Sequence, residues 1–139
     1  MIQNGPIVIV EDDLDDQELL KSVFLELEIE NELLFFSDGV EAFAYLKETK
    51  DYPLLILSDI NMPKLNGLDL RGKIDNHEQL RMKCIPFIFL TTASDRKVVL
   101  DAYSKLVQGY FVKPHSYVGF RFLIKTIFAY WKSCNSAIC

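Results

Sequence analysis

Three carboxylate side chains stand within two residues of the ends of short apolar runs of the chain. Glu11 and Asp12 follow Ile7–Val10, and Asp59 follows Leu54–Leu57 with a single serine between them. If the ends of these runs meet, the like charges raise one another's pKa values and destabilise the fold unless a cation neutralises them. Mg²⁺ suits such a place, because it binds hard oxygen ligands and often contacts a phosphoryl oxygen as well. One carboxylate is then free to attack phosphorus and form an acyl phosphate.

A hydroxyl and an ammonium group stand at equivalent positions farther along the chain. Thr91 follows Pro86–Leu90, and Lys113 follows Gly109–Val112. Both groups suit phosphoryl oxygens, because positioning and charge stabilisation dominate phosphoryl transfer. Taken singly, each has a plainer explanation: Thr91 could bond to backbone, Lys113 could be a solvated surface lysine, and Asp13 could cap a helix. Their shared place after apolar runs favours the joint interpretation.

The elements that must position these residues are five strands that alternate with five helices. The predicted strands are Ile7–Val10, Leu33–Phe36, Leu54–Leu57, Pro86–Leu90 and Gly109–Val112. The predicted helices are residues 16–29, 40–47, a helix that begins near Leu68, 97–105 and 117–131. This alternation predicts an α/β fold with a five-stranded parallel sheet, doubly wound with helices on both faces. Ligands of such sheets bind beyond the carboxyl ends of the strands, where all the residues above would meet.

Length and charge limit the class of protein. The 139 residues predict a single domain over positions 1–139, with a core from about 6 to 132 and no output domain. Fifteen basic and twenty acidic residues give a net charge of -5 without a long basic cluster, so we expect no nucleic-acid partner. The N-terminus lacks the features of a signal peptide, and no apolar run is long enough to span a membrane.

The cysteines and histidines carry no predicted function. Cys84, Cys134 and Cys139 contain no CxxC pair, so neither a disulfide framework nor a zinc site is expected, and the reducing cytoplasm is the expected location. His77 lies in a polar stretch and His115 follows a Lys–Pro turn, and both are expected to be solvated.

Four segments of the chain together resemble the receiver domain of bacterial two-component response regulators. They are Ile7-Val-Ile-Val-Glu-Asp-Asp13, Ser58-Asp-Ile-Asn-Met-Pro-Lys-Leu-Asn-Gly67, Phe89-Leu-Thr-Thr92 and Gly109-Tyr-Phe-Val-Lys-Pro114. The resemblance covers nearly the whole chain and implies the flavodoxin-like, CheY-like (βα)5 fold. It also implies phosphorylation by a sensor histidine kinase or a phosphotransfer protein, with Mg²⁺ as cofactor.

The resemblance assigns a role to each residue that matches the family's pattern. It implies that Asp59 accepts the phosphoryl group, with Thr91 and Lys113 as its helpers. The metal site implied for Mg²⁺ consists of Glu11, Asp12, Asp59 and the backbone carbonyl of Asn61. The switch implied by the family consists of Thr91 and the aromatic Tyr110. The family pattern further implies a cis peptide bond between Lys113 and Pro114.

The resemblance also carries expectations about regulation. Phosphorylation would draw Thr91 towards the phosphoryl group, let Tyr110 rotate inward and change the surface formed by the fourth helix, fifth strand and last helix. The last helix has more apolar residues than one buried stripe needs, which predicts homodimerisation or partner docking through this face. Thr92 stands where many receivers carry Ala or Gly, and its bulk is predicted to slow hydrolysis of the acyl phosphate. The Asp12–Gln17 run, the Thr91–Thr92 pair and Ala129–Trp131 resemble stand-alone receivers of the phytochrome-associated type.

Three alternative functions differ in what they require of the sequence. A haloacid-dehalogenase-type phosphatase would need a second Asp two residues after its nucleophile, where this chain has Asn61. A phosphate-independent interaction module would be free to lose the site residues that this chain keeps. A phosphate sink or relay would keep them all, and the sequence does not separate it from an effector. In none of the receiver interpretations is the chain an enzyme with a separate substrate; it only accepts and loses its own phosphoryl group.

Overall fold

A single parallel sheet organises the chain in the computed structural model, which describes residues 4–134. The strands are β1 (Ile7–Val10), β2 (Leu33–Phe36), β3 (Leu55–Ser58), β4 (Phe87–Thr91) and β5 (Gly109–Val112). They lie in the order β2-β1-β3-β4-β5, and every neighbouring pair is parallel. All five predicted strands are therefore confirmed, with β3 and β4 beginning and ending one residue later than the sequence indicated.

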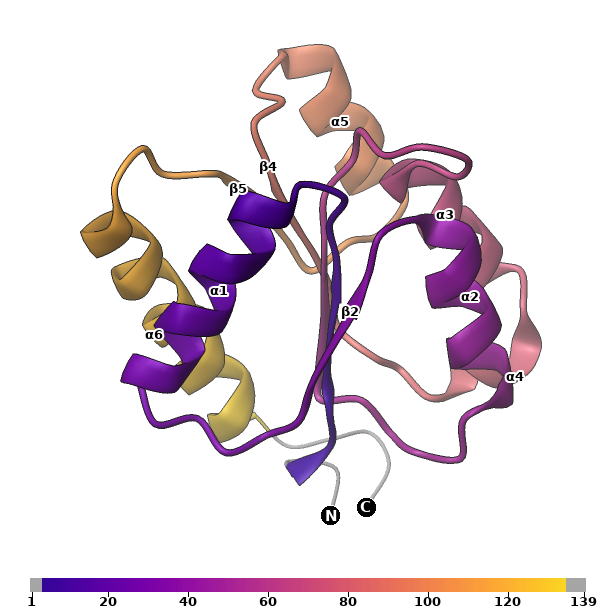
Figure 1. Ribbon diagram of the computed structural model, residues 1–139. Helices are drawn as coiled ribbons and strands as arrows, with labels where there is room; N and C mark the ends of the chain where they lie inside the picture. Colours follow the sequence, from indigo (N-terminus) through magenta and orange to yellow (C-terminus); the bar gives the residue numbers. More distant parts are fainter. Residues whose placement is uncertain (1–3, 135–139) are drawn as a thin grey trace.

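Helices cover both faces of the sheet (Figure 1). They are α1 (Leu14–Glu26), α2 (Gly39–Glu48), α3 (Gly67–Asp75), α4 (Glu78–Met82), α5 (Arg96–Ser104) and α6 (Tyr117–Ser133). In Figure 1, α1 and α6 lie on one side of the sheet, and α2, α3 and α4 lie on the other. The predicted doubly wound α/β fold is confirmed.

Alternation along the strands explains how one sheet supports two cores. On one face, Val8, Ile56 and Phe89 pack with residues of α2, α3, α4 and α5. The next residues along the chain point the opposite way, so Ile9 and Leu57 pack with residues of α1 and α6. Because successive side chains of a strand point to opposite faces, a strand buried on both sides needs a continuous apolar run. This requirement is why the fully buried strands β1, β3 and β4 were readable from the sequence.

The short helix α4 was missed by the sequence analysis, which expected one helix after Leu68. His77 separates the two helices that the structure contains, and it caps α4 by accepting a hydrogen bond from the backbone N–H of Leu80 at its Nδ1 atom, 3.3 Å away. Its ring also lies edge-on to Phe43, with 6.1 Å between ring centroids. The expectation of a solvated His77 without any role was therefore wrong, because the side chain has a structural one.

Arg71 of α3 joins two elements of the same layer. Its guanidinium donates hydrogen bonds to the backbone carbonyls of Lys105 and Leu106, at 3.1 and 3.0 Å. It also lies over the ring of Phe87, 5.6 Å from the centroid, and pairs with Asp75 at 3.3 Å. These contacts attach the C-terminal end of α5 to α3 and the sheet.

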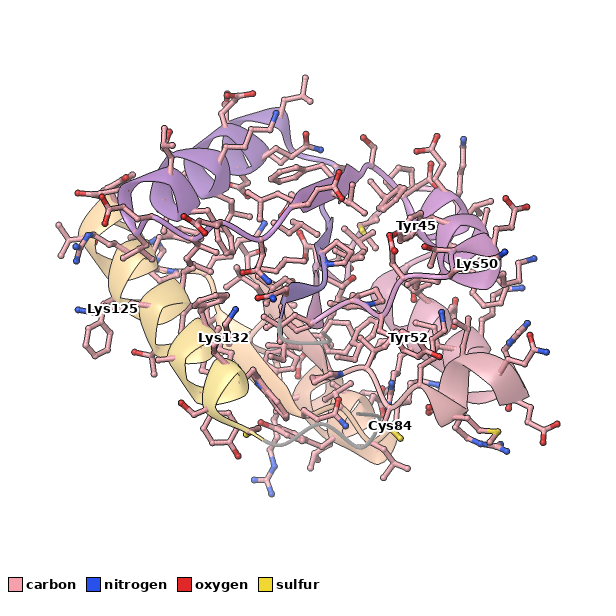
Figure 2. The ribbon with its side chains drawn as sticks, turned by 90° about the horizontal axis from the view of Figure 1, so that it is seen from below. Tyr45, Lys50, Tyr52, Cys84, Lys125 and Lys132 are labelled. Carbon is pink, nitrogen blue, oxygen red and sulfur yellow. The ribbon has the colours of Figure 1, made fainter. Side chains whose placement is uncertain are left out.

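The edge of the sheet opposite the carboxyl ends of the strands is seen from below in Figure 2. Lys125 and Lys132 of α6 lie on one side of the sheet, and Tyr45 of α2 lies on the other side with Lys50 and Tyr52. Cys84 and Cys134 are both free thiols; Cys84 is exposed and Cys134 is half-buried. Cys139 lies outside the described residues. Within residues 4–134, none of the helices combines the length and hydrophobicity that a membrane crossing needs.

Candidate functional site

The carboxyl ends of β1, β3, β4 and β5 bring the predicted site residues to one edge of the sheet. Glu11, Thr91 and Lys113 are all buried, although their side chains are polar. Asp59 lies among them directly after β3 and is only 8% exposed. Asp12 is exposed at the rim. The sequence prediction that these five residues converge is confirmed by their positions.

Asp59 has both carboxylate oxygens occupied by donors. Its Oδ1 atom accepts hydrogen bonds from the backbone N–H of Ile60 at 2.7 Å and from the Thr91 hydroxyl at 2.5 Å. Its Oδ2 atom accepts from Lys113 Nζ at 3.1 Å. The backbone N–H of Asp59 donates to the Val10 carbonyl at 2.9 Å, which fixes the start of the loop against β1. The carboxylate is thus held in one orientation with a cation beside it.

Gly67 allows the chain to close tightly behind Asp59. Its backbone N–H donates to the Ile60 carbonyl at 2.8 Å. A Cβ atom at this position would lie 2.2 Å from the Asp59 carbonyl oxygen and 2.7 Å from Cε1 of Phe89. Only a glycine fits here without displacing the loop that carries the carboxylate.

Glu11 is the most deeply buried acid of the site, at 3% exposure. Burial raises the pKa of its carboxyl from 4.5 to about 7, although the hydrogen bonds from Lys113 and from the backbone N–H of Asp13 act in the opposite direction. The backbone N–H of Glu11 donates to the Phe36 carbonyl at 2.9 Å, and its carbonyl accepts from the buried Gln17 side chain at 2.5 Å. The position of Glu11 is therefore fixed by hydrogen bonds to both β2 and α1.

Lys113 forms the electrostatic centre of the site. Its Nζ atom lies 2.6 Å from Glu11 Oε1, 2.6 Å from Asp16 Oδ2 and 3.1 Å from Asp59 Oδ2. Burial alone would lower the pKa of Lys113, but the hydrogen bonds to Asp16 and Glu11 outweigh it and raise the pKa. The ammonium group therefore stays charged at any physiological pH.

Asp16 is a site residue that the sequence analysis missed. It lies in the first turn of α1, whose N-cap is Asp13; the Asp13 side chain accepts from the backbone N–H groups of Asp15 and Asp16. The plainer explanation offered for Asp13, a helix cap, is thus confirmed. The signal for Asp16 was present in the spacing, because a helix that begins after β1 turns every third or fourth residue back towards the site.

The carboxylates of Glu11, Asp12 and Asp59 form a group that fits a divalent cation. One oxygen from each lies within 4.8 Å of the others. Oxygen ligands of this kind, with charge to be neutralised, suit Mg²⁺ or Mn²⁺. Asn61 is exposed in the loop after β3, two residues beyond Asp59.

Tyr110 of β5 is half-buried and connected to the site through the loop after β4. Its hydroxyl donates a hydrogen bond to the Ala93 carbonyl. The backbone N–H of Ala93 in turn donates to the Thr91 hydroxyl at 3.4 Å. The ring of Tyr110 packs against Phe89 and Tyr103, with ring-centroid separations of 6.0 and 6.5 Å. Burial and the charges of Asp59 and Asp95 raise the pKa of Tyr110, so the phenol is protonated and able to donate.

The peptide bond between Lys113 and Pro114 is trans, since the described residues contain no cis peptide bond. The cis bond expected from the resemblance is therefore wrong for this structure. A trans bond is the intrinsically preferred form before proline, by about 0.5–1 kcal/mol. In this geometry Lys113 already reaches all three carboxylates, so its ion pairs do not require the cis form.

Comparisons with known proteins agree with this geometry. The family described as the response regulator receiver domain matches residues 7–121. The response regulator Rcp1 of Synechocystis is 31% identical over 130 residues, which cover 90% of this chain and 87% of that protein.

Two solved structures share the fold over nearly their whole length. The phosphorylated cyanobacterial phytochrome response regulator RcpA superposes with a TM-score of 0.85 at 27% identity, covering 96% of this chain and 98% of that one. The Mn²⁺-bound form of Rcp1 has a TM-score of 0.81 at 28% identity, with 95% and 97% covered.

Proposed function

Because this chain belongs to the response regulator receiver domain family, we propose that Asp59 is the residue on which it accepts a phosphoryl group. Receiver domains obtain that group from histidine kinases, so the donor is a phosphohistidine of a sensor kinase or of a phosphotransfer protein. The observation that carries the assignment is the position of Asp59, an oriented carboxylate at the carboxyl end of β3 with Lys113 Nζ 3.1 Å away. Carboxylates so placed are suited to nucleophilic attack on phosphorus.

The transfer is a substitution at phosphorus. A carboxylate oxygen of Asp59 forms the new P–O bond while the P–N bond of the phosphohistidine breaks, and the imidazole leaves with the bonding electron pair and takes up a proton. Lys113 and the Thr91 hydroxyl, both within hydrogen-bond distance of Asp59, are placed to donate to the phosphoryl oxygens. Such donors stabilise the charge that spreads over those oxygens during transfer.

The two buried acids Glu11 and Asp59 and the exposed Asp12 supply the metal site in this proposal. Glu11, Asp12, Asp59 and the backbone carbonyl of Asn61 would hold Mg²⁺, and the distances among the three carboxylates are compatible with this. The bound ion supplies positive charge that offsets the repulsion between these carboxylates and an incoming phosphoryl group. The similar Rcp1 has a Mn²⁺-bound form, which supports a divalent cation as a ligand of this chain.

Thr91 and Tyr110 form the proposed switch. The Thr91 hydroxyl would exchange Asp59 for a phosphoryl oxygen, and the backbone of Ala93 would pass the change to Tyr110 through the hydrogen bonds on its two sides. Receiver domains are signalling domains and not classical enzymes. In this proposal the only further chemistry is hydrolysis of the protein's own acyl phosphate, in which water replaces Asp59 at phosphorus.

We further propose that the surface formed by α5, β5 and α6 binds a second copy of the chain. Here β5 is an edge strand, and a groove beside it is lined by Phe111, Thr126, Tyr130 and Trp131. Tyr130 is 62% exposed, and apolar surface of this kind marks interaction sites. We also propose that the protein is cytoplasmic and binds neither membranes nor nucleic acids. The net charge of -5 supports the exclusion of nucleic acids.

The decisive experiment for the phosphoryl transfer is intact-mass spectrometry after incubation with acetyl phosphate, with and without Mg²⁺. We expect a single phosphoryl adduct that needs Mg²⁺ and is lost in Asp59→Asn. Asp101→Asn, which changes an exposed carboxylate of α5, is the matched control and should keep the adduct.

Two results would contradict the proposal. An adduct that persists in Asp59→Asn would place the phosphoryl group elsewhere. No adduct on the folded wild type with Mg²⁺, from acetyl phosphate or from a phosphohistidine donor, would favour a phosphate-independent interaction module.

A further inference from the structure

Lys113 has more carboxylate partners than phosphoryl transfer requires. A lysine ammonium has three protons to donate, and here they meet Glu11 Oε1, Asp16 Oδ2 and Asp59 Oδ2. The two shorter distances, both 2.6 Å, are those to Glu11 and Asp16. The position of Nζ is therefore set mainly by these two acids, and the longer bond points at Asp59.

Two of the three carboxylate partners of Lys113 have a second role in the proposed function. Asp59 gives up an oxygen to phosphorus, and Glu11 belongs to the group of three carboxylates that would hold the metal. Asp16 does not belong to the group of three carboxylates, which is drawn from the described residues. It is thus the acid that can keep its contact with Lys113 throughout the reaction.

The fold fixes Asp16 independently of the metal and of phosphate. The Asp13 cap binds the backbone N–H of Asp16 at 3.2 Å and so defines the first turn of α1. The buried Gln17, the next residue of the helix, ties that turn to the Glu11 carbonyl at 2.5 Å. The Asp16 side chain itself is 28% exposed, so it is partly shielded from solvent.

We propose that Asp16 is a positioning residue for the phosphoryl transfer: it anchors Lys113 so that the ammonium group faces Asp59 and the incoming phosphoryl group. The inference rests on the proposed function of Asp59. Without the anchor, the ammonium group keeps its charge, but only groups engaged by the reaction hold it in place. Loss of positioning lowers the rate even when all reacting groups remain.

Asp15 provides a matched control for the loss of charge. It lies in the same first turn of α1, is exposed, and its change to Asn removes the same unit of negative charge at the same helix end. Removing a negative charge should by itself help an anionic phosphodonor to approach. A slower reaction in Asp16→Asn than in Asp15→Asn therefore cannot come from the change in net charge.

The test compares phosphorylation by acetyl phosphate, at saturating Mg²⁺, in the wild type, Asp16→Asn, Asp15→Asn and Asp16→Glu. We expect Asp16→Asn to lower the rate constant about tenfold, which corresponds to a large part of one charge-assisted hydrogen bond. Asp15→Asn should stay close to the wild type, and Asp16→Glu, which keeps the carboxylate, should regain most of the rate. Equal rates in Asp16→Asn and Asp15→Asn would overturn the inference.

A spectroscopic measurement separates failure of this inference from failure of the proposed function. In ¹⁵N-lysine NMR spectra, an ammonium group held by carboxylates gives a signal that is protected from rapid exchange with water. The Lys113 signal should be present in the unphosphorylated wild type and in Asp15→Asn, and broadened or lost in Asp16→Asn. A protected signal that survives in Asp16→Asn would reject the anchor even if the wild type is phosphorylated normally. An unreactive wild type would instead reject the role of Asp59.

Discussion

Burial strongly changes the acid–base behaviour of Glu11. Burial raises its pKa from 4.5 to about 7, so near neutral pH the metal-free protein holds a mixture of the protonated and ionised forms. Because the pKa is higher in the folded state, protonation of Glu11 stabilises the fold fully below pH 4.5, and this contribution is lost as the pH rises through 7. A bound cation reverses this preference, since it requires the carboxylate.

We therefore expect the rise in melting temperature caused by Mg²⁺ to be larger at pH 8 than at pH 6. At pH 6 the ion must displace a proton from Glu11, and ligand binding stabilises the folded state only by the free energy left after that step. Thermal unfolding with and without Mg²⁺ at several pH values measures the effect. Glu11→Gln should bind more weakly and lose this pH dependence, and an equal shift at both pH values in the wild type would contradict the argument.

Thr92 is predicted to prolong the lifetime of an acyl phosphate on Asp59. It is exposed beside the buried Thr91, and we predict that its side chain limits the approach of water to a phosphoryl group on Asp59. Replacing it by Ala opens that approach, so Thr92→Ala should lose its phosphoryl group a few times faster than the wild type. The decay of the intact-mass adduct after removal of acetyl phosphate gives the rate. A variant that dephosphorylates no faster would remove the idea.

At the scale of elements, α3 carries two glycines with opposite requirements. A Cβ on Gly67 would lie 2.2 Å from the Asp59 carbonyl oxygen, whereas one on Gly72 would meet nothing closer than Lys105 Nζ at 3.8 Å. Gly67→Ala should cost about 1–3 kcal/mol through overpacking and disturb the loop of Asp59. Gly72→Ala, in the helix interior, should stabilise by about 0.5–1 kcal/mol. Chemical denaturation of both variants measures this, and equal effects would show that the close approach at Gly67 is unimportant.

The helices and strands differ in how far they could be predicted from the sequence. The strands were predictable because burial on both faces leaves only apolar side chains between Ile7 and Val10. The break between α3 and α4 was not, because His77 is not one of the usual N-cap residue types and its contact with Phe43 is long-range. The roles of Glu11, Asp12, Asp59, Asn61, Thr91 and Lys113 came from the resemblance and stay predictions. The trans bond at Pro114 shows the limit of such transfer.

At the scale of the whole molecule, the proposed dimer surface can be tested with one exposed aromatic residue. Tyr130 borders the groove beside β5 and contacts Trp131 edge-on at 5.0 Å. Light scattering across concentrations should show a dimer for the wild type and a weaker one for Tyr130→Ser. Tyr52→Ser, which removes an exposed tyrosine on the side of the sheet away from α6, should leave the assembly unchanged (Figure 2). A wild type that stays monomeric at high concentration, with and without phosphoryl group, would argue strongly against the dimer.

The contacts of Arg71 give α5 the mechanics of a hinged lever. Its C-terminal end is pinned where Arg71 binds the Lys105 and Leu106 carbonyls, while its N-terminal end follows the loop of Ala93. With a fulcrum at one end, a displacement applied near Ala93 swings the helix instead of sliding it. The displacement should be largest beside the proposed phosphorylation site and smallest near Arg71. A partner that reads phosphorylation from α5 would therefore find the greatest difference at the Arg96 end of the helix.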